Sequence, residues 1–200
     1  MDSVGPGAVS RRQSLLNAPA QSPVKKEFLL KGLDYYYRSS YGDLGQKLKV
    51  GVYVEFENRE RAGLGMPLPK GIVRVYKKDS AGGAQFVGED RIDHTPKNED
   101  IRLKLGDAFD VTAAKKQTVF EKKADYGPYE YVFESAYEIK LKNAKKETVT
   151  VKVMEPMPGD WKVLTESHPH AREASGTAVW EVPVPAEGET ILTYRVQVRF

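Results

Sequence analysis

The sequence predicts an all-β protein, an antiparallel immunoglobulin-like β-sandwich of about 8 to 11 strands with little or no helix. Residues 128–143 alternate apolar and polar side chains in period two, which is typical of a strand with one buried face. Short segments of similar character follow along the chain, with turn signals about every 8 to 12 residues. No long segment shows the three- and four-residue apolar spacing of a helix.

The alternating stretch is the central strand of this prediction. One face carries mainly aromatic and aliphatic side chains, and the other is rich in glutamate and lysine. We expect Tyr137, Ile139 and Leu141 in the core. At about 3.3 Å per residue, the thirteen alternating residues 129–141 would span roughly 43 Å if unbroken, more than twice the usual length. We therefore expect it to bend or to serve two sheets.

The other strands follow from alternation and from the turns between them. Gly82 and Gly83 suit the tight reversal of a hairpin. Lysines at 115, 116, 122 and 123 predict an exposed edge or face. We interpret residues 1–23 as a disordered leader or linker, and residues 24–200 as a single β-sandwich domain. The other expected strands are 24–31, 46–58, 71–78, 84–92, 101–105, 109–123, 147–155, 161–164, 177–184 and 189–200.

Composition narrows the possible functions. The chain has 31 basic and 28 acidic residues, and no basic stripe predicts a nucleic-acid partner. It has no cysteine, which excludes disulfides, thiolate metal sites and cysteine nucleophiles. No apolar run is long enough for a transmembrane helix, so we expect no membrane insertion. The first residues lack the apolar centre of a signal peptide.

Five stretches of the sequence carry a resemblance to a known family. Over residues 24–200, and in collinear order, the chain resembles the C-terminal domain of mucoidy-inhibitor-type envelope proteins, a bacterial family of unknown function. The resemblance implies a C-terminal piece of an exported, periplasmic or secreted protein of a Gram-negative bacterium, whose partners include the other domains of the full-length protein. It implies no activity and no functional residues. The stretches are LGMPLPKGIVRVYKKD (64–79), GEDRIDHTPKNE (88–99), LGDAFDV (105–111), EPMPGDW (155–161) and VPVPAEGETILTYRVQVRF (182–200).

Two polar groups are candidates for sites of chemistry. His168 and His170 could bind zinc, but a proline separates them in a polar loop, so we interpret them as solvated and expect no metal or cofactor. Asp93 and His94 lie in a turn, and no Gly-x-Ser-x-Gly elbow completes a triad. The alternative function is an envelope polysaccharide hydrolase. Its acids would come from Glu89, Asp93, Asp160, Glu130, Glu134 and Glu138.

The tyrosines are the best candidates for binding. Eleven are present, four of them in residues 35–41 and four in 126–137. Tyrosine combines a flat apolar ring with a hydroxyl, which suits contact with a peptide or a sugar. We expect a non-catalytic structural or binding module that contacts a protein or glycan partner. The candidate binding residues are Tyr35, Tyr36, Tyr37, Tyr41, Tyr126, Tyr129 and Tyr131.

Overall fold

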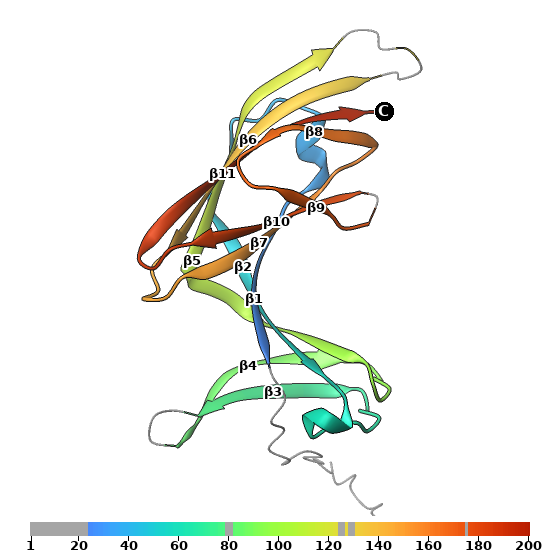
Figure 1. Ribbon diagram of the computed structural model, residues 1–200, viewed down its shortest axis with the longest axis vertical. Coiled ribbons are helices and arrows are strands. Elements are labelled where there is room, and N and C mark those ends of the chain that lie inside the picture. The colour runs from blue at the N-terminus through green and yellow to red at the C-terminus, as the bar shows by residue number, and fades with distance from the viewer. Residues whose placement is uncertain (1–23, 79–81, 124–126, 128–130, 175) are drawn as a thin grey trace, which may run out of the picture.

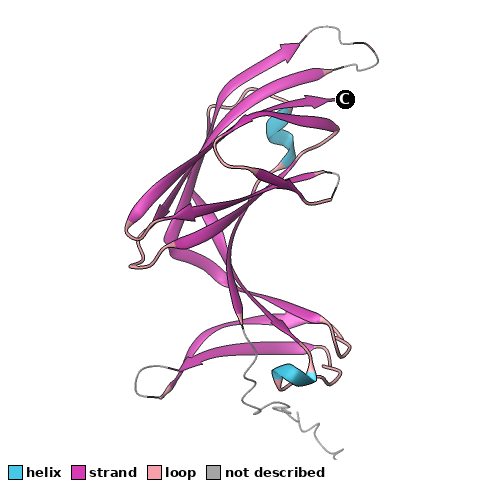
Figure 2. Cartoon of the chain, in the orientation of Figure 1, coloured by secondary structure: helices cyan, strands magenta, loops and turns pink. Residues whose placement is uncertain are grey.

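The computed structural model describes residues 24–78, 82–123, 127, 131–174 and 176–200. Eleven strands and two 3-10 helices form the regular structure of this part of the chain, which confirms the all-β prediction (Figure 2). No helix in it is long and apolar enough to cross a membrane. The strands are β1 (Lys25–Lys31), β2 (Asp43–Glu57), β3 (Gly71–Lys78), β4 (Ala84–Ile92), β5 (Asp100–Lys123), β6 (Val132–Asn143), β7 (Val149–Pro156), β8 (Asp160–Glu166), β9 (His170–Arg172), β10 (Thr177–Val184) and β11 (Gly188–Arg199); the helices are η1 (Asp34–Tyr37) and η2 (Glu60–Ala62).

Nine strands form one curled sheet in the order β8-β11-β6-β5-β2-β1-β7-β10-β9 (Figure 1). β3 and β4 form a separate two-stranded sheet. Neighbouring strands run antiparallel except β1 and β7, where residues 28–31 pair in parallel with 151–154. The sheet is therefore mixed at this one pair. Because parallel neighbours cannot be joined by a tight turn, the turn signals in the sequence do not reveal it.

The curl brings the two edge strands, β8 and β9, together. Nδ1 of His170 in β9 lies 2.9 Å from a carboxylate oxygen of Glu166 in β8. The same oxygen accepts a hydrogen bond from the indole of Trp180 at 2.8 Å. Arg172 donates to the backbone carbonyl of Trp161 at 3.2 Å. Side chains thus join the two edge strands, although the described residues form no backbone ladder between them.

One strand, β5, runs the length of the molecule (Figure 1). It has 24 residues, or roughly 80 Å at about 3.3 Å per residue. The sequence predicted two strands here, 101–105 and 109–123, and expected a double-length strand at 128–143 instead. β6, however, begins at Val132 and has 12 residues. Gly106 at φ 137° and several register shifts against β2 let β5 continue from the small unit around the β3–β4 hairpin into the curled sheet.

The predicted hairpin of β3 and β4 packs on the lower parts of β2 and β5 (Figure 1). A small apolar cluster of Leu68, Ile101 and Leu103 lies there. β4 approaches β5 closely at Gly88, where an added Cβ would lie 2.7 Å from the carbonyl oxygen of Leu105. This small unit is therefore joined to the curled sheet by continuous strands.

The main core lies inside the curled sheet. Tyr137, Ile139 and Leu141 are all buried, which confirms the predicted face of β6. The ring of Trp180 stacks on Tyr194, with centroids 4.7 Å apart. Alternation places side chains from every strand of the sheet except β9 in this interior.

Candidate functional site

An ion pair lies inside the curled sheet. Nζ of Lys115, from β5, lies 2.7 Å from Oε2 of Glu155, from β7, and the two side chains are 1% and 0% exposed. The hydroxyl of Tyr37 donates to the same oxygen at 3.3 Å and lies 3.1 Å from the hydroxyl of Tyr194. The other oxygen, Oε1, has no hydrogen-bond partner among the described residues. The pair links two strands that are distant in sheet order.

The sequence prediction that Lys115 is exposed is wrong. Strand alternation places Lys115 on the same face as Val111, Ala113 and Gln117, all buried. The neighbouring Lys116 is the exposed one. The two-residue alternation of β5 indicates that Lys115 is buried, whereas the run of lysines in the same segment indicates exposure.

Burial governs the ionisation of this cluster. Desolvation lowers the pKa of Lys115, while the charge of Glu155 and its hydrogen bond raise it in part. Desolvation, followed by the charge of Glu155, raises the pKa values of Tyr37 and Tyr194 well above the usual range. The ammonium also lies over the ring of Tyr137, 4.7 Å from its centroid. Protonated tyrosines are therefore the donors in the network.

The helix η1 covers this cluster. The carbonyl oxygen of Tyr36 accepts hydrogen bonds from the hydroxyl of Tyr137 at 2.6 Å and the amide of Gln117 at 3.2 Å. Just before η1, Gly32 faces the carboxylate of Glu155, where an added Cβ would lie 1.9 Å from Oε2. The arrangement can hold η1 against β5 and β6 and tie β5 to β7. Its reactive groups face the interior, so its chemistry is that of a structural network.

Beyond η1, the inner face of β5, β6 and β11 continues as a row of aromatic rings, which we call the aromatic face: Phe120, Tyr131, Phe133 and Phe200. Ladder pairing places Phe120 opposite the buried Ser135, so this is the core-facing side of the sheet. The Phe133 ring stacks on Phe120 and Tyr131 with centroids 5.7 and 6.2 Å away. The apolar side chains of the core-facing side, which we call the core stripe, thus continue to the end of β5 and the start of β6 and are partly exposed there.

Two cations lie within the aromatic face. Lys122 lies over the Tyr131 ring at 4.5 Å from its centroid, and Arg38 lies over Phe200 at 4.7 Å. Tyr131 is 39% exposed. Both cations belong to exposed residues. The surface therefore combines apolar area with positive charge.

The predicted binding tyrosines separate into distinct environments. Tyr35 is 48% exposed and Tyr41 is half-buried, with ring centroids 5.9 Å apart. Tyr36 and Tyr37 are buried, so they form no part of a surface. Tyr131 lies on the aromatic face; Tyr126 and Tyr129 lie outside the described residues. Sequence interpretation missed Phe120, Phe133 and Phe200; for Phe133 the signal was its place on the apolar face of the alternating stretch.

The other candidate residues take part in local contacts. His170 joins β9 to β8, and His168 lies 2.9 Å from the hydroxyl of Ser167. Nδ1 of His94 accepts a hydrogen bond from the Lys70 backbone at 3.4 Å. Within the described chain, no group of three or more His, Cys, Asp or Glu side chains could hold a metal ion. Each described candidate acid has a basic partner: Glu89 with Arg74, Asp93 with Lys70, Asp160 with Arg199, Glu134 with Arg195 and Glu138 with Lys116; Glu130 is outside the described residues.

Comparison with known proteins returned no match to a family model, to a curated protein or to a solved structure. The resemblance to the mucoidy-inhibitor-type domain therefore stays a prediction.

Proposed function

We propose that this protein is a non-catalytic binding module that contacts a partner protein through its aromatic face and through Tyr35, which lies in η1 three residues before Arg38. The observation that carries the proposal is the continuation of the core stripe past η1 as partly exposed aromatic rings with two cations among them. Tyrosine and arginine are common among residues that dominate protein interfaces. A contiguous exposed apolar surface with a polar border is typical of a contact site.

The packing of the rings favours a protein over a sugar. A sugar stacks on an open aromatic face, but the ring of Tyr131 has Phe133 on one side and Lys122 near its face. The Tyr35 ring packs edge-to-face against Tyr36 and Tyr41. Ring edges, hydroxyls and cations suit an apolar peptide segment bordered by carboxylates.

The acids considered for a hydrolase give the alternative less support. Asp160 lies 3.4 Å from Arg199, and Glu134 lies 2.7 Å from Arg195. Both carboxylates are thus engaged in ion pairs within the protein, whereas a glycosidase needs a pair of carboxyl groups that flank the substrate. We therefore prefer the binding module.

We also propose, on the resemblance in sequence, that the full-length protein belongs to the cell envelope, where this domain would contact its other domains or an envelope partner. Fractionation of cells that express the full-length protein tests this. Recovery in the periplasmic or secreted fraction is expected, and recovery only in the cytoplasm would contradict it.

The binding proposal can be tested with a peptide-display library and a glycan array. We expect enriched peptides that combine apolar and acidic residues, with binding at least about tenfold weaker to Tyr35→Ala/Tyr131→Ala. The matched control is Tyr76→Ala/Phe86→Ala, because these rings are 55% and 52% exposed on the β3–β4 hairpin. Both variants should bind equally if the proposal is wrong. Glycan binding lost only in the first variant would assign a sugar partner instead.

The choice of variants follows from burial. A triple substitution of Tyr35, Tyr36 and Tyr37 would remove two buried rings, and a loss of binding could then reflect unfolding. Tyr35 and Tyr131 are the more exposed of the described candidates. Thermal unfolding of the double variant should therefore stay close to that of the parent protein.

A further inference from the structure

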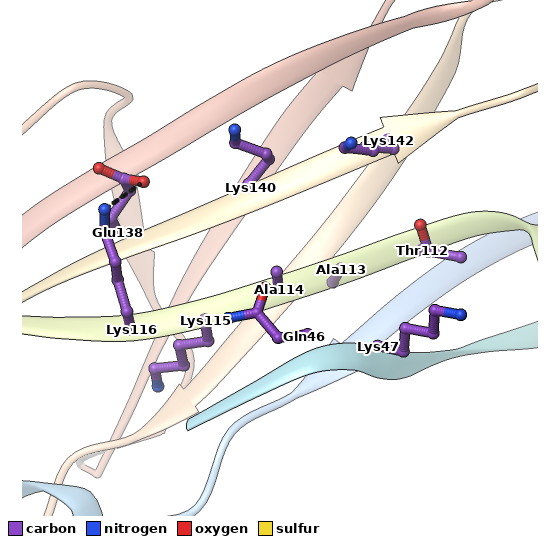
Figure 3. Close-up of a pocket in the computed structure, with 10 residues that line it drawn as sticks. All are labelled: Gln46, Lys47, Thr112, Ala113, Ala114, Lys115, Lys116, Glu138, Lys140 and Lys142. Carbon is purple, nitrogen blue, oxygen red and sulfur yellow. Dashed lines mark ion pairs between the residues drawn. The ribbon is translucent and has the colours of Figure 1, made fainter. Parts of the chain in front are cut away.

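A groove lies on the outer face of the curled sheet, opposite the core (Figure 3). It encloses about 410 Å³ between β2 and β6, and β5 forms its floor. Thr112 and Ala114 are the small floor residues. Ladder pairing places Lys142 opposite Thr112 and Lys140 opposite Ala114. Short side chains flanked by long ones therefore create the depression.

Irregular pairing of β2 opens the groove on its other side. The register of β2 against β5 shifts around Gly45, which has φ 133°. Bulges of this kind bend a strand and redirect its side chains. Asp43 holds the turn, accepting hydrogen bonds from the Gly45 backbone at 2.8 Å and the Gln46 amide at 2.5 Å. Gln46 is thereby oriented at the groove wall, beside Lys47.

The groove has more positive than negative charge. Lys116 pairs with Glu138 at 3.1 Å. Lys140 and Lys142 both approach the carboxylate of Glu189, at 4.0 and 3.8 Å. Lys47 makes no ion pair with any residue that the structure describes. Four lysines thus face two carboxylates. The lysines and Glu138 lie around the floor (Figure 3), and Glu189 is not among the lining residues.

We propose that this groove binds an extended acidic peptide segment. Lys140 and Lys142 are two residues apart on one strand, so their side chains start roughly 6.6 Å apart. Acidic side chains at every second position of an extended peptide have the same spacing. Glu189 shows that these two lysines converge on a carboxylate. The amide of Gln46 and the hydroxyl of Thr112 can bond the peptide backbone.

The lining favours this occupant over single-stranded nucleic acid. Base recognition on single strands uses aromatic stacking, and the ten lining residues include no aromatic side chain and no arginine. The groove is also separate from the aromatic face, because it lies on the opposite side of β5 and β6. This inference therefore stands independently of the partner contact proposed above.

Two synthetic peptides of identical composition test the inference. One, about 12 residues long, alternates glutamate and threonine; the other carries all its glutamates in one block. Calorimetry at low salt should show at least about fivefold tighter binding of the alternating peptide. Lys140→Gln/Lys142→Gln should weaken it at least about fivefold, and Lys47→Gln by a smaller factor.

The control removes the same charge elsewhere. Lys31→Gln/Lys162→Gln, both exposed and outside the groove, should change affinity less than about twofold. Oligo(dT) and polygalacturonate, matched in charge, complete the set of probes. Equal affinity for the two peptides, equal loss in the control variant, or tighter binding of either polymer would overturn the inference. Because the substituted lysines are exposed, apart from the half-buried Lys140, unchanged thermal unfolding will confirm that each variant is folded.

Discussion

Lys115 and Glu155 approach to 2.7 Å in the interior of the curled sheet, at a point where η1 excludes water from both. Moving two charges out of water costs several kcal/mol per ion, and only good geometry with further hydrogen bonds offsets that cost. Tyr37 supplies one such bond, and it belongs to η1. The pair therefore defines where η1 docks, because a displaced η1 would leave the carboxylate with one partner fewer.

Removal of one partner should be strongly destabilising. Lys115→Met leaves Glu155 buried without its counter-ion, which we expect to cost about 3–5 kcal/mol in the free energy of unfolding. Lys115→Met/Glu155→Leu removes both charges and should cost less than the single change. Urea unfolding measures both. The control is Lys116→Met, whose side chain is 52% exposed, with an effect within about 0.5 kcal/mol. A Lys115→Met variant as stable as this control would contradict the prediction.

Alkaline pH should unfold the protein through its buried tyrosines. Desolvation raises the pKa of Tyr36 to about 12 and those of Tyr37 and Tyr194 well above the usual value near 10. Above pH 10 the folded protein then keeps protons that the unfolded chain releases. Stability is complete below pH 10 and falls as pH rises toward the folded pKa values. The lowered pKa values of Lys115 and Lys26 act in the opposite direction, but they are two groups against several.

Unfolding measured between pH 9 and 12 tests this dependence. Tyr194→Phe removes one of the groups with a raised pKa. Above pH 10, the fall in its free energy of unfolding should be shallower than that of the parent protein by about 1.4 kcal/mol per pH unit. The variant should also lose about 1 kcal/mol at neutral pH, with the hydrogen bond to Tyr37. If the stability of the two proteins falls in parallel with pH, Tyr194 titrates alike in the folded and the unfolded state, and the prediction is wrong.

Gly32 is required by the space around Glu155. An alanine Cβ there would lie 1.9 Å from Oε2, and the carboxylate cannot move without breaking the contacts to Lys115 and Tyr37. We expect Gly32→Ala to lower the free energy of unfolding by about 1–3 kcal/mol. Gly42→Ala is the matched control, because nothing lies within 4 Å of its added Cβ. Equal urea midpoints for the two variants would show that the carboxylate relocates freely.

The sequence predicted most strands because each has its own local pattern. The face of β6 and the β3–β4 hairpin could be predicted from alternation and turn residues. The continuity of β5 could not, since Gly106 and its neighbours resemble a break until β2 pairs with them. The parallel contact of β1 with β7 joins residues more than a hundred positions apart. Such long-range pairing has no local signal.

The candidate sites were predictable in part for the same reason. The core stripe becomes exposed near Tyr131, and the alternation of the segment that forms β6 predicts this. Burial of Tyr37 depends on η1, which has no periodic pattern in the sequence. The partner of Lys115 lies 40 positions away on a strand that is not its neighbour in the sheet. Contacts across the interior of a curled sheet depend on how far the sheet curls, and the sequence alone does not predict that curvature.

Asn143, at the end of β6, should be among the most sensitive single positions. It is 2% exposed, and its amide donates to the carbonyl oxygens of Glu147 at 2.8 Å, Pro185 at 3.0 Å and Val184 at 3.3 Å. Its own carbonyl accepts from the backbone of Lys145 at 2.9 Å. One side chain therefore satisfies backbone groups of two turns. Asn58 has the same role at the end of β2, bonding Gly65, Met66 and Pro96.

Asn143→Ala would leave these buried backbone groups unpaired, so we expect a loss of about 2–4 kcal/mol in the free energy of unfolding. Asn143→Asp keeps the acceptor for Lys145 but loses the donors, and should be no more stable than the alanine variant. Lys142→Ala, with an exposed side chain, is the neighbouring control, within about 0.5 kcal/mol. Urea unfolding compares all three. If Asn143→Ala costs less than about 1 kcal/mol, water replaces the lost donors, and the two turns do not depend on this side chain.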